Sequence, residues 1–347
     1  MVPRNILSMT LASHPLHTAS PSHTLAHRRL GTSGLSISAL GLGCNNLGRA
    51  HTATASFEGS QEVIAAALDA GITFFDVADN YGAAPGLSEE FLGRALGGYR
   101  DHVTVATKFG MANGGISGPD FGARGSRRYI INAVEGSLRR LGTDYIDLFQ
   151  FHTPDPNTPI DETLAALDLL VTSGKVRYIG HSNRSGWQIA QAEYVARQLG
   201  TTRFISSQSH YNLIDRRAEL EVVPAAQEFG LGLLPYFPLA NGLLTGKYSQ
   251  AHAPADGRVT HSKPELLKSA PWQALDALHA FAAERQLTMI QVAFSWLAAQ
   301  PVVASVIAGA TRPEQITENA SAIVPLTQSD LTALDAIFPA PPKVALF

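Results

Sequence analysis

Few features that mark a specialised class of protein occur in this chain of 347 residues. Its only cysteine, Cys44, rules out an intramolecular disulfide and fits a reducing compartment such as the cytoplasm. No apolar run reaches the roughly 18 residues of a membrane span, so we expect no membrane association. Lys and Arg number 26 against 29 Asp and Glu, and the formal net charge of -3 gives no electrostatic case for nucleic-acid binding.

Acidic residues are missing from the start of the chain, where none precedes Glu58. Residues 1–27 are rich in His, Ser, Thr, Pro and Ala, which predicts a flexible N-terminal extension. A targeting peptide, or an upstream start with Met9 as the true first residue, are the alternatives. No group of His, Cys and acidic residues has metal-ligand spacing, so no metal site is expected. The proline-rich residues 339–347 predict an extended tail.

Strand-like and helix-like segments alternate through the remaining residues, 28–338, with no sign of an internal domain boundary. Short apolar, β-branched or aromatic runs predict buried strands, and amphipathic stretches predict helices. Eight strands with helical crossovers favour an α/β fold of the (β/α)8 TIM-barrel type over an open doubly wound sheet. The predicted strands are Ser38–Gly43, Ile72–Asp76, Val103–Lys108, Tyr145–Phe151, Val176–His181, Phe204–Gln208, Gly232–Tyr236 and Val303–Ala308. The predicted helices are Gln61–Ala70, Ser88–Leu96, Ser126–Leu141, Asp161–Val171, Gly186–Leu199, Ala218–Phe229, Trp272–Glu284 and Met289–Ala299.

Three further segments complete the predicted architecture. Residues Arg29–Ile37 read as an N-terminal β-hairpin with its turn at residues 32–34, placed to plug the bottom of the barrel. The long connection 239–268 follows the seventh strand and lacks strong periodicity, which indicates a lid at the C-terminal face or a disordered segment. Residues 115–122 are a second, shorter lid candidate on that face.

Two glycine-rich segments imitate phosphate-binding motifs. In Gly41–Gly48 the third glycine of a dinucleotide-binding fingerprint would fall on Asn46, and no helix follows at once. The segment Gly242–Lys247 is one residue short of a P-loop and lacks its Ser or Thr. We reject both interpretations.

Four polar residues close, or closely follow, three of the predicted strands: Asp76, Tyr81, Lys108 and His152. The C-terminal ends of barrel strands converge on one mouth, so these side chains are expected to meet there. Each alone has an ordinary explanation, such as a turn cap or a solvated strand end. A phenol, an ammonium, a carboxylate and an imidazole together indicate proton-transfer chemistry.

At these residues the chain resembles the aldo-keto reductase superfamily. The likeness covers about residues 28–338, and its loops look most like the bacterial branch that also resembles potassium-channel β subunits. The segments that carry it are Asp76–Gly82, Thr107–Gly110, Leu141–Leu148, Phe151–His152, Ile179–Asn183, Gln208, Tyr211–Asn212, Tyr236–Leu239, Gly242–Lys247 and Gly309–Asn319.

The resemblance implies an enzyme that reduces an aldehyde or ketone with a nicotinamide cofactor, Tyr81 being the general acid. A phenol has a pKa near 10, and a nearby ammonium, here Lys108, acts to lower it. Asp76 would pair with Lys108 and keep it charged. His152 would hydrogen-bond the substrate carbonyl and share the proton relay.

Cofactor contacts carry over by position. Ser182, Asn183 and Gln208 match the positions that bind the nicotinamide carboxamide, and Tyr236 matches the aromatic that stacks on the ring. Leu239 matches a backbone contact to the pyrophosphate. Phe237 stands where a serine is common, so one side-chain contact to the pyrophosphate is expected to be missing.

The adenosine end departs further from the family pattern. Gly309 stands where many members carry a basic residue, and Gln315 where many carry arginine. Arg312 is the remaining cation on this loop and would take a 2′-phosphate. Gln315, Glu318 and Asn319 would bind ribose and adenine. Glutamine at the position of Gln315 is common in the resembled branch, which favours NADPH, and the loss of the usual basic residues keeps NADH or dual use as the alternative.

Asn45, Asn46 and Phe109 lie at strand ends and are candidates for lining the substrate pocket, although the asparagines fit equally well as turn residues. Two other functions remain open. One is an NAD-dependent sugar or secondary-alcohol dehydrogenase on the same fold. The other is a cofactor-binding regulatory subunit with incidental activity. The sequence leaves the small-molecule carbonyl substrate, and the choice between monomer and homo-oligomer, undetermined.

Overall fold

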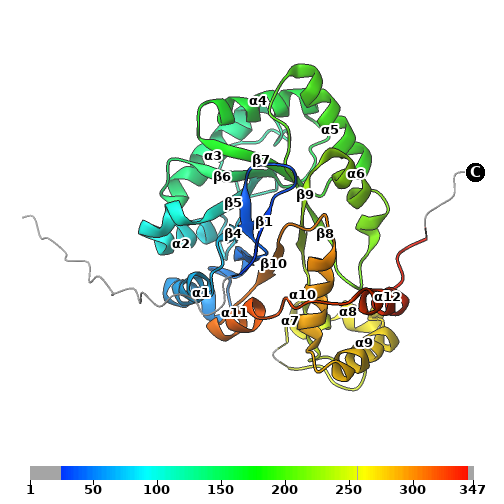
Figure 1. The fold of residues 1–347 in the computed structure, drawn as a ribbon. Coiled ribbons are helices and arrows are strands. Elements are labelled where there is room, and N and C mark those ends of the chain that lie inside the picture. Colours follow the sequence, from blue (N-terminus) through cyan, green and yellow to red (C-terminus); the bar gives the residue numbers. More distant parts are fainter. Residues whose placement is uncertain (1–24, 256, 343–347) are drawn as a thin grey trace, which may run out of the picture.

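The computed structural model describes residues 25–255 and 257–342 and confirms the predicted barrel. Eight parallel strands pair in the order β10-β3-β4-β5-β6-β7-β8-β9 and enclose the centre of the molecule (Figure 1). The remaining seam is bridged at Leu233, which donates to the carbonyl of Val302 (2.7 Å) and accepts from the amide of Ala304 (3.0 Å). The strands are β3 (Leu40–Gly43), β4 (Phe74–Asp76), β5 (Thr104–Phe109), β6 (Ile146–Phe151), β7 (Val176–Ser182), β8 (Ser206–His210), β9 (Gly232–Tyr236) and β10 (Val306–Gly309).

Helices surround the barrel because each parallel pair needs a crossover that covers the outer face of the sheet (Figure 1). Their ends follow local capping chemistry: α3, for example, begins after the Ser126 N-cap and ends at Gly142, whose φ of 63° suits a left-handed C-cap. The principal helices are α1 (Phe57–Asp69), α2 (Leu87–Leu96), α3 (Arg127–Leu141), α4 (Ile160–Thr172), α5 (Gly186–Leu199), α6 (Val222–Phe229), α9 (Trp272–Glu284), α10 (Met289–Ala299), α11 (Pro313–Ala320) and α12 (Gln328–Ile337).

The strands are buried on both faces, and alternate residues serve different layers. All six residues of β5 are buried. Ala106 packs among the side chains inside the barrel, whereas Val105 and Phe109 belong to the larger core between barrel and helices. Since side chains alternate along a strand, Lys108 points inward with Ala106. This alternation brings a charged group to the mouth of a fully buried strand.

The predicted N-terminal hairpin is present and closes the bottom of the barrel. Strands β1 (His27–Arg29) and β2 (Ser36–Ser38) pair antiparallel. Leu30 and Ile37 are fully buried against the interior residues Phe74 and Leu148. The turn lies so close to the start of β9 that a Cβ on Gly31 would come within 2.2 Å of the Gly230 carbonyl oxygen, which explains the glycine.

The long connection 239–268 contains three short helices that were not predicted: η5 (Ala240–Thr245), α7 (Arg258–Ser262) and α8 (Glu265–Ser269). Each is too short to produce a readable 3.6-residue period. Helix α12 was also missed, although its capping box between Thr327 and Asp330 was a usable signal.

The proposed N-terminal extension at 1–27 and the tail at 339–347 lie largely outside the described residues. Among the residues described, no helix has the length and apolar character needed to cross a bilayer.

Candidate active site

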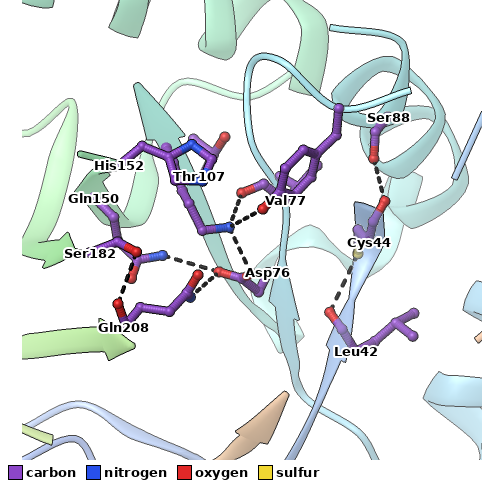
Figure 2. A network of polar contacts seen from close by, with 12 residues as sticks. Leu42, Cys44, Asp76, Val77, Ser88, Thr107, Gln150, His152, Ser182 and Gln208 are labelled. Carbon is purple, nitrogen blue, oxygen red and sulfur yellow. Dashed lines mark hydrogen bonds and ion pairs between the residues drawn. The ribbon is translucent and has the colours of Figure 1, made fainter. Parts of the chain in front are cut away.

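The four predicted catalytic residues lie together at the C-terminal mouth of the barrel. Asp76 is the last residue of β4, Tyr81 follows in the next loop, Lys108 lies on β5, and His152 follows β6. Asp76, Lys108 and His152 are buried, whereas Tyr81 is half-buried. Figure 2 shows the polar network around these residues, whose side chains come from neighbouring strands.

Lys108 is the centre of this network. Its Nζ donates to Asp76 Oδ2 (2.7 Å), to the Val77 carbonyl (2.8 Å) and, at 3.3 Å, to the hydroxyl of Tyr81 (Figure 2). Complete burial acts to lower the pKa of the ammonium, but the Asp76 carboxylate and the Tyr81 hydroxyl outweigh it and raise the pKa above its ordinary value. Lys108 is therefore charged over the whole physiological range.

Tyr81 differs in one respect from the sequence-based expectation. Burial raises the pKa of its phenol, and the opposing effect of Lys108, although real, does not bring the pKa below its ordinary value. The hydroxyl is thus protonated at neutral pH. A group in this state can donate a proton, and Lys108 is in place to stabilise the phenolate that results.

His152 is a neutral imidazole. Burial, and then the charge of Lys108, lower its pKa well below the ordinary value of 6.5. The ring meets Tyr81 edge to face, with centroids 5.8 Å apart. Nδ1 is buried and has no hydrogen-bond partner among the described residues, while the side chain lines the cavity described below. The nitrogen that reaches the cavity is therefore Nε2.

Gln150 is a member of the site that the sequence did not reveal. Its Nε2 donates to Asp76 Oδ1 (3.0 Å), and Gln208 donates to the same oxygen (2.9 Å) (Figure 2). Asp76 therefore has a donor on each oxygen and is fixed in orientation. The signal was readable, since Gln150 lies two residues before His152 and so faces the same side of β6.

A cavity of about 1650 Å³ opens at this mouth and contains most of the predicted site. Asp76, Tyr81 and His152 line it together with many of the residues assigned to the cofactor and substrate. Those further residues are Asn45, Asn46, Ser182, Asn183, Gln208, Tyr236, Phe237, Leu239, Gly309, Arg312 and Gln315.

Asn183 ties the catalytic and cofactor walls of this cavity together. Its Nδ2 donates to the His152 carbonyl (2.9 Å), and its Oδ1 accepts from the Tyr236 hydroxyl (2.9 Å). Its backbone has a φ of 58°, a left-handed conformation that asparagine tolerates better than most residues. Ser182 donates to the carbonyl of Gln208 (2.9 Å), which fixes the adjoining strand ends.

The loop after β9 has an unusual backbone. Phe237, Ala240 and Asn241 all have positive φ values, of 54°, 48° and 61°, and Gly242 follows at 118°. Non-glycine residues in this region carry strain that concentrates at functional sites. Asn241 lines the cavity, and its Oδ1 is buried without a partner among the described residues.

The far end of the cavity contains only part of the predicted adenosine site. Gln315 Oε1 accepts from the amide of Thr311 (2.8 Å), so this side chain holds the loop of Arg312. Glu318 is exposed and Asn319 is buried within α11, and neither lines the cavity. Lys247, which the sequence did not indicate, also lines the cavity.

Phe109 does not line the pocket, contrary to the prediction. Its ring is fully buried and stacks on Phe149 and Phe151, with centroids 4.6 and 5.0 Å away. The error follows from strand alternation, because the residue after the inward-pointing Lys108 must face outward.

No group of three or more His, Cys, Asp or Glu side chains in the described part of the chain is arranged to hold a metal ion.

Comparison with known proteins identifies the family to which the chain belongs. The model of the Aldo/keto reductase family matches residues 39–338. The L-glyceraldehyde 3-phosphate reductase of Escherichia coli (strain K12) is 37% identical over 318 residues, which are 88% of this chain and 89% of that protein. The oxidoreductase YrpG of Bacillus subtilis (strain 168), called uncharacterized, is 38% identical and covers 90% and 95% of the two chains.

A third relative is named as a channel subunit and not as an oxidoreductase. The probable voltage-gated potassium channel subunit beta of Oryza sativa subsp. japonica is 35% identical over 336 residues, or 92% of this chain and 98% of its own. All three relatives match over nearly their full length. The chain belongs to the aldo/keto reductase family and is an NAD(P)H-dependent oxidoreductase.

Proposed function

We propose that the chain reduces an aldehyde or ketone to an alcohol with NADPH, and that Tyr81 is the proton donor. The observation that carries the proposal is the position of Lys108, 2.7 Å from the Asp76 carboxylate and 3.3 Å from the Tyr81 hydroxyl. A permanent cation beside a protonated phenol is the arrangement that lets a phenol act as an acid at neutral pH.

The residues of the cavity fit a nicotinamide dinucleotide. The cavity volume of about 1650 Å³ exceeds the roughly 300 to 1,000 Å³ of a typical small-ligand pocket, so the cavity has room for a cofactor and a substrate together. Tyr236 offers an aromatic face, Asn183 and Ser182 offer polar groups for a carboxamide, and Lys247 and Arg312 offer cations for phosphates. The family relationship supports this use of the cavity.

The chain's own residues account for the proton. The bound cofactor supplies the hydride. Tyr81 donates its hydroxyl proton to the oxygen of the substrate carbonyl, and Lys108 stabilises the phenolate left behind. His152 is neutral and lines the cavity; the tautomer with its proton on Nε2 donates to the same oxygen and polarises the carbonyl. Asp76 keeps Lys108 in place and is itself held by Gln150 and Gln208.

NADPH is preferred to NADH in this proposal because of Arg312. The side chain is exposed at the start of α11, lines the cavity, and has no ion-pair partner within the described residues. A free guanidinium suits a 2′-phosphate, which it can bind with two parallel hydrogen bonds.

The E. coli relative's name directs the choice of substrate to test. We include a phosphorylated aldehyde because the Arg49 side chain lines the cavity. Its guanidinium has the neutral Oδ1 of Asn46 (3.3 Å) as its one hydrogen-bond partner within the described chain. Within the described lining, Asp76 is the one acidic side chain, and Lys108 neutralises it. We place the enzyme in the cytoplasm, whose reducing conditions suit the buried free thiol of Cys44.

The test is the initial rate of NADPH and NADH oxidation with 4-nitrobenzaldehyde and with glyceraldehyde 3-phosphate, for the wild type and Tyr81→Phe. We expect NADPH-dependent turnover that the substitution abolishes, with cofactor affinity unchanged. Turnover that survives in Tyr81→Phe would refute the role of Tyr81. Turnover only in the direction of alcohol oxidation with NAD would favour the dehydrogenase alternative.

The rice relative's name supports a second candidate, a regulatory subunit that binds the cofactor and turns over slowly. This candidate predicts tight cofactor binding, negligible rates with every carbonyl tested, and a cellular role that survives Tyr81→Phe. The same variant therefore separates the two functions.

A further inference from the structure

A histidine outside the cavity wall supports the aromatic ring of Tyr236. His210 is the last residue of β8 and is the parallel-ladder partner of Tyr236 at the end of β9. Their rings stack with centroids 5.4 Å apart and planes within 8° of parallel. Tyr236 lines the cavity, whereas His210 does not, so His210 forms a second layer behind the tyrosine.

The hydrogen bonds of Asn212 determine which nitrogen of His210 carries the proton. Asn212 Oδ1 accepts from the backbone amides of Ile214 (3.0 Å) and Asp215 (2.9 Å), so the side-chain nitrogen must point the other way. That nitrogen lies 3.2 Å from His210 Nε2, which therefore accepts. His210 Nδ1 lies 3.1 Å from Asp215 Oδ2 and carries the proton.

Protonation of Nε2 would break this arrangement. An imidazolium presents N–H groups on both sides and can no longer accept from Asn212. The same Asn212 nitrogen also donates to the Phe237 carbonyl (2.9 Å), at the start of the strained loop after β9. The charge state of His210 is thus coupled to Tyr236 through the stack and to the loop through Asn212.

The charged surroundings favour the neutral ring at neutral pH. Burial lowers the pKa of His210, and Asp215 opposes this effect without overcoming it. Arg217 and Lys263 lower the pKa further. Tyr236 and Phe237, the other groups in contact with the ring, are uncharged aromatics. His210 is neutral near pH 7 and gains its charge as the pH falls below the ordinary histidine range.

We propose that His210 is a positioning residue that holds the Tyr236 ring for cofactor binding and makes the relative affinity for oxidised and reduced nicotinamide depend on pH. The inference rests on the proposed function, which places the nicotinamide ring against the cavity face of Tyr236. The oxidised nicotinamide ring carries a positive charge and the reduced ring does not. A cation behind Tyr236 therefore disfavours the oxidised cofactor selectively.

Calorimetric titration of NADP+ and NADPH between about pH 5.5 and pH 8 tests the inference, with NADPH dissolved immediately before each injection because acid degrades it. In the wild type we expect the ratio of Kd(NADP+) to Kd(NADPH) to rise about fivefold as the pH falls. The 2′-phosphate also titrates in this range, but it is common to both cofactors and cancels in the ratio.

His210→Phe is the matched control, because it keeps an aromatic ring behind Tyr236 and removes the titrating nitrogens. We expect it to bind both cofactors with near wild-type affinity at pH 8 and to show a ratio independent of pH. His210→Ala removes the stack, and we expect it to weaken both cofactors severalfold at every pH. Far-ultraviolet circular dichroism of each variant confirms that the barrel is folded.

Two outcomes would overturn the inference: a ratio that is flat in the wild type, or one that varies equally in His210→Phe. Tyr236→Ala separates this failure from a failure of the proposed function. If Tyr236→Ala weakens both cofactors while His210→Phe matches the wild type at every pH, the role of His210 alone is wrong. If Tyr236→Ala changes neither affinity, the nicotinamide lies elsewhere and the proposed cofactor site is wrong.

Discussion

The two ends of the barrel interior are built from the same strands but from opposite kinds of residue. At the bottom, Phe74, Ala106 and Leu148 pack against the hairpin and exclude water. Two residues further along the same three strands stand Asp76, Lys108 and Gln150, which bond to one another at the mouth. A step of two keeps the side chain on the interior face, so each strand changes from support to chemistry within about 7 Å.

The residues that stabilise the fold and the residues that react are therefore separated along the barrel axis. Burial of apolar area at the bottom stabilises the fold, and this contribution does not depend on the charge state of any side chain. The mouth contains buried charges that would be unfavourable if they were unpaired, and their pairing fixes the geometry of the reacting groups. Substitutions at the two ends should therefore have different signatures.

The largest expected effect is the loss of activity in Tyr81→Phe. Removing the proton donor should lower kcat/KM by about 100- to 10,000-fold, because general acid catalysis contributes on this scale. The melting temperature and the cofactor Kd should stay near wild type, since the ring is retained. Steady-state kinetics and thermal denaturation provide the two readouts, and a large loss of stability would contradict the separation.

Leu148→Ala is the corresponding substitution at the bottom of the barrel, where we expect a loss of stability. The side chain is fully buried beside Leu30 and Phe74, and its truncation should lower the free energy of unfolding by about 2 to 5 kcal/mol. Activity per folded molecule should change little. Urea denaturation measures the free energy of unfolding. Steady-state rates, divided by the concentration of cofactor-binding sites from a titration, measure the activity per folded molecule. If this variant had normal stability and a lowered kcat/KM, the bottom of the barrel would contribute to reactivity and the separation of the two ends would be refuted.

A smaller effect is expected from Asp79, which is buried just beyond the mouth. Burial, and then repulsion from Glu89, raise the pKa of its carboxyl to about 7. Because the folded-state pKa exceeds that of the unfolded chain, this group contributes stability at low pH that is lost as the pH rises toward 7. Wild type should therefore lose about 2 kcal/mol relative to Asp79→Asn between pH 5 and pH 7.5.

Denaturant titration of both proteins at the two pH values measures this difference. The buried histidines His152 and His181, whose pKa values lie well below 6.5, push stability the opposite way but do so equally in both proteins. A difference that does not vary with pH would show that Asp79 stays ionised throughout.

The smallest effect is expected from Arg312→Ala. Loss of an exposed charge-assisted contact should raise the Kd for NADPH about tenfold and leave that for NADH unchanged. Arg139→Ala removes an exposed arginine of α3 that does not line the cavity, so it is the control and should leave the Kd of both cofactors near wild type. Equal weakening of NADPH and NADH in Arg312→Ala would remove the basis for preferring NADPH.

The sequence predicted all eight barrel strands, most of them from short apolar or β-branched runs, although β8 itself is made of the polar residues Ser206–His210. It also brought Asp76, Tyr81, Lys108 and His152 to one place, since strand ends converge in a barrel. The assignment of Phe109 failed because proximity in sequence was used where strand alternation decides. Gln150 could have been found, because strand alternation puts it on the same side of β6 as His152. His210 could not, because its importance lies in its contact with Tyr236, and pairing across strands is not written in either segment alone.

The hairpin plug has a consequence for the order in which the chain assembles. Thr32 docks on the carbonyl of Gly230, a residue 198 positions later in the chain. At about 5 to 20 residues per second, a ribosome needs roughly 10 to 40 s to make the intervening segment. Throughout that time Leu30 and Ile37 have no barrel to enter. The hairpin can therefore complete its contacts only after the chain has been made as far as Gly230, so closure of the barrel floor is a late event in assembly.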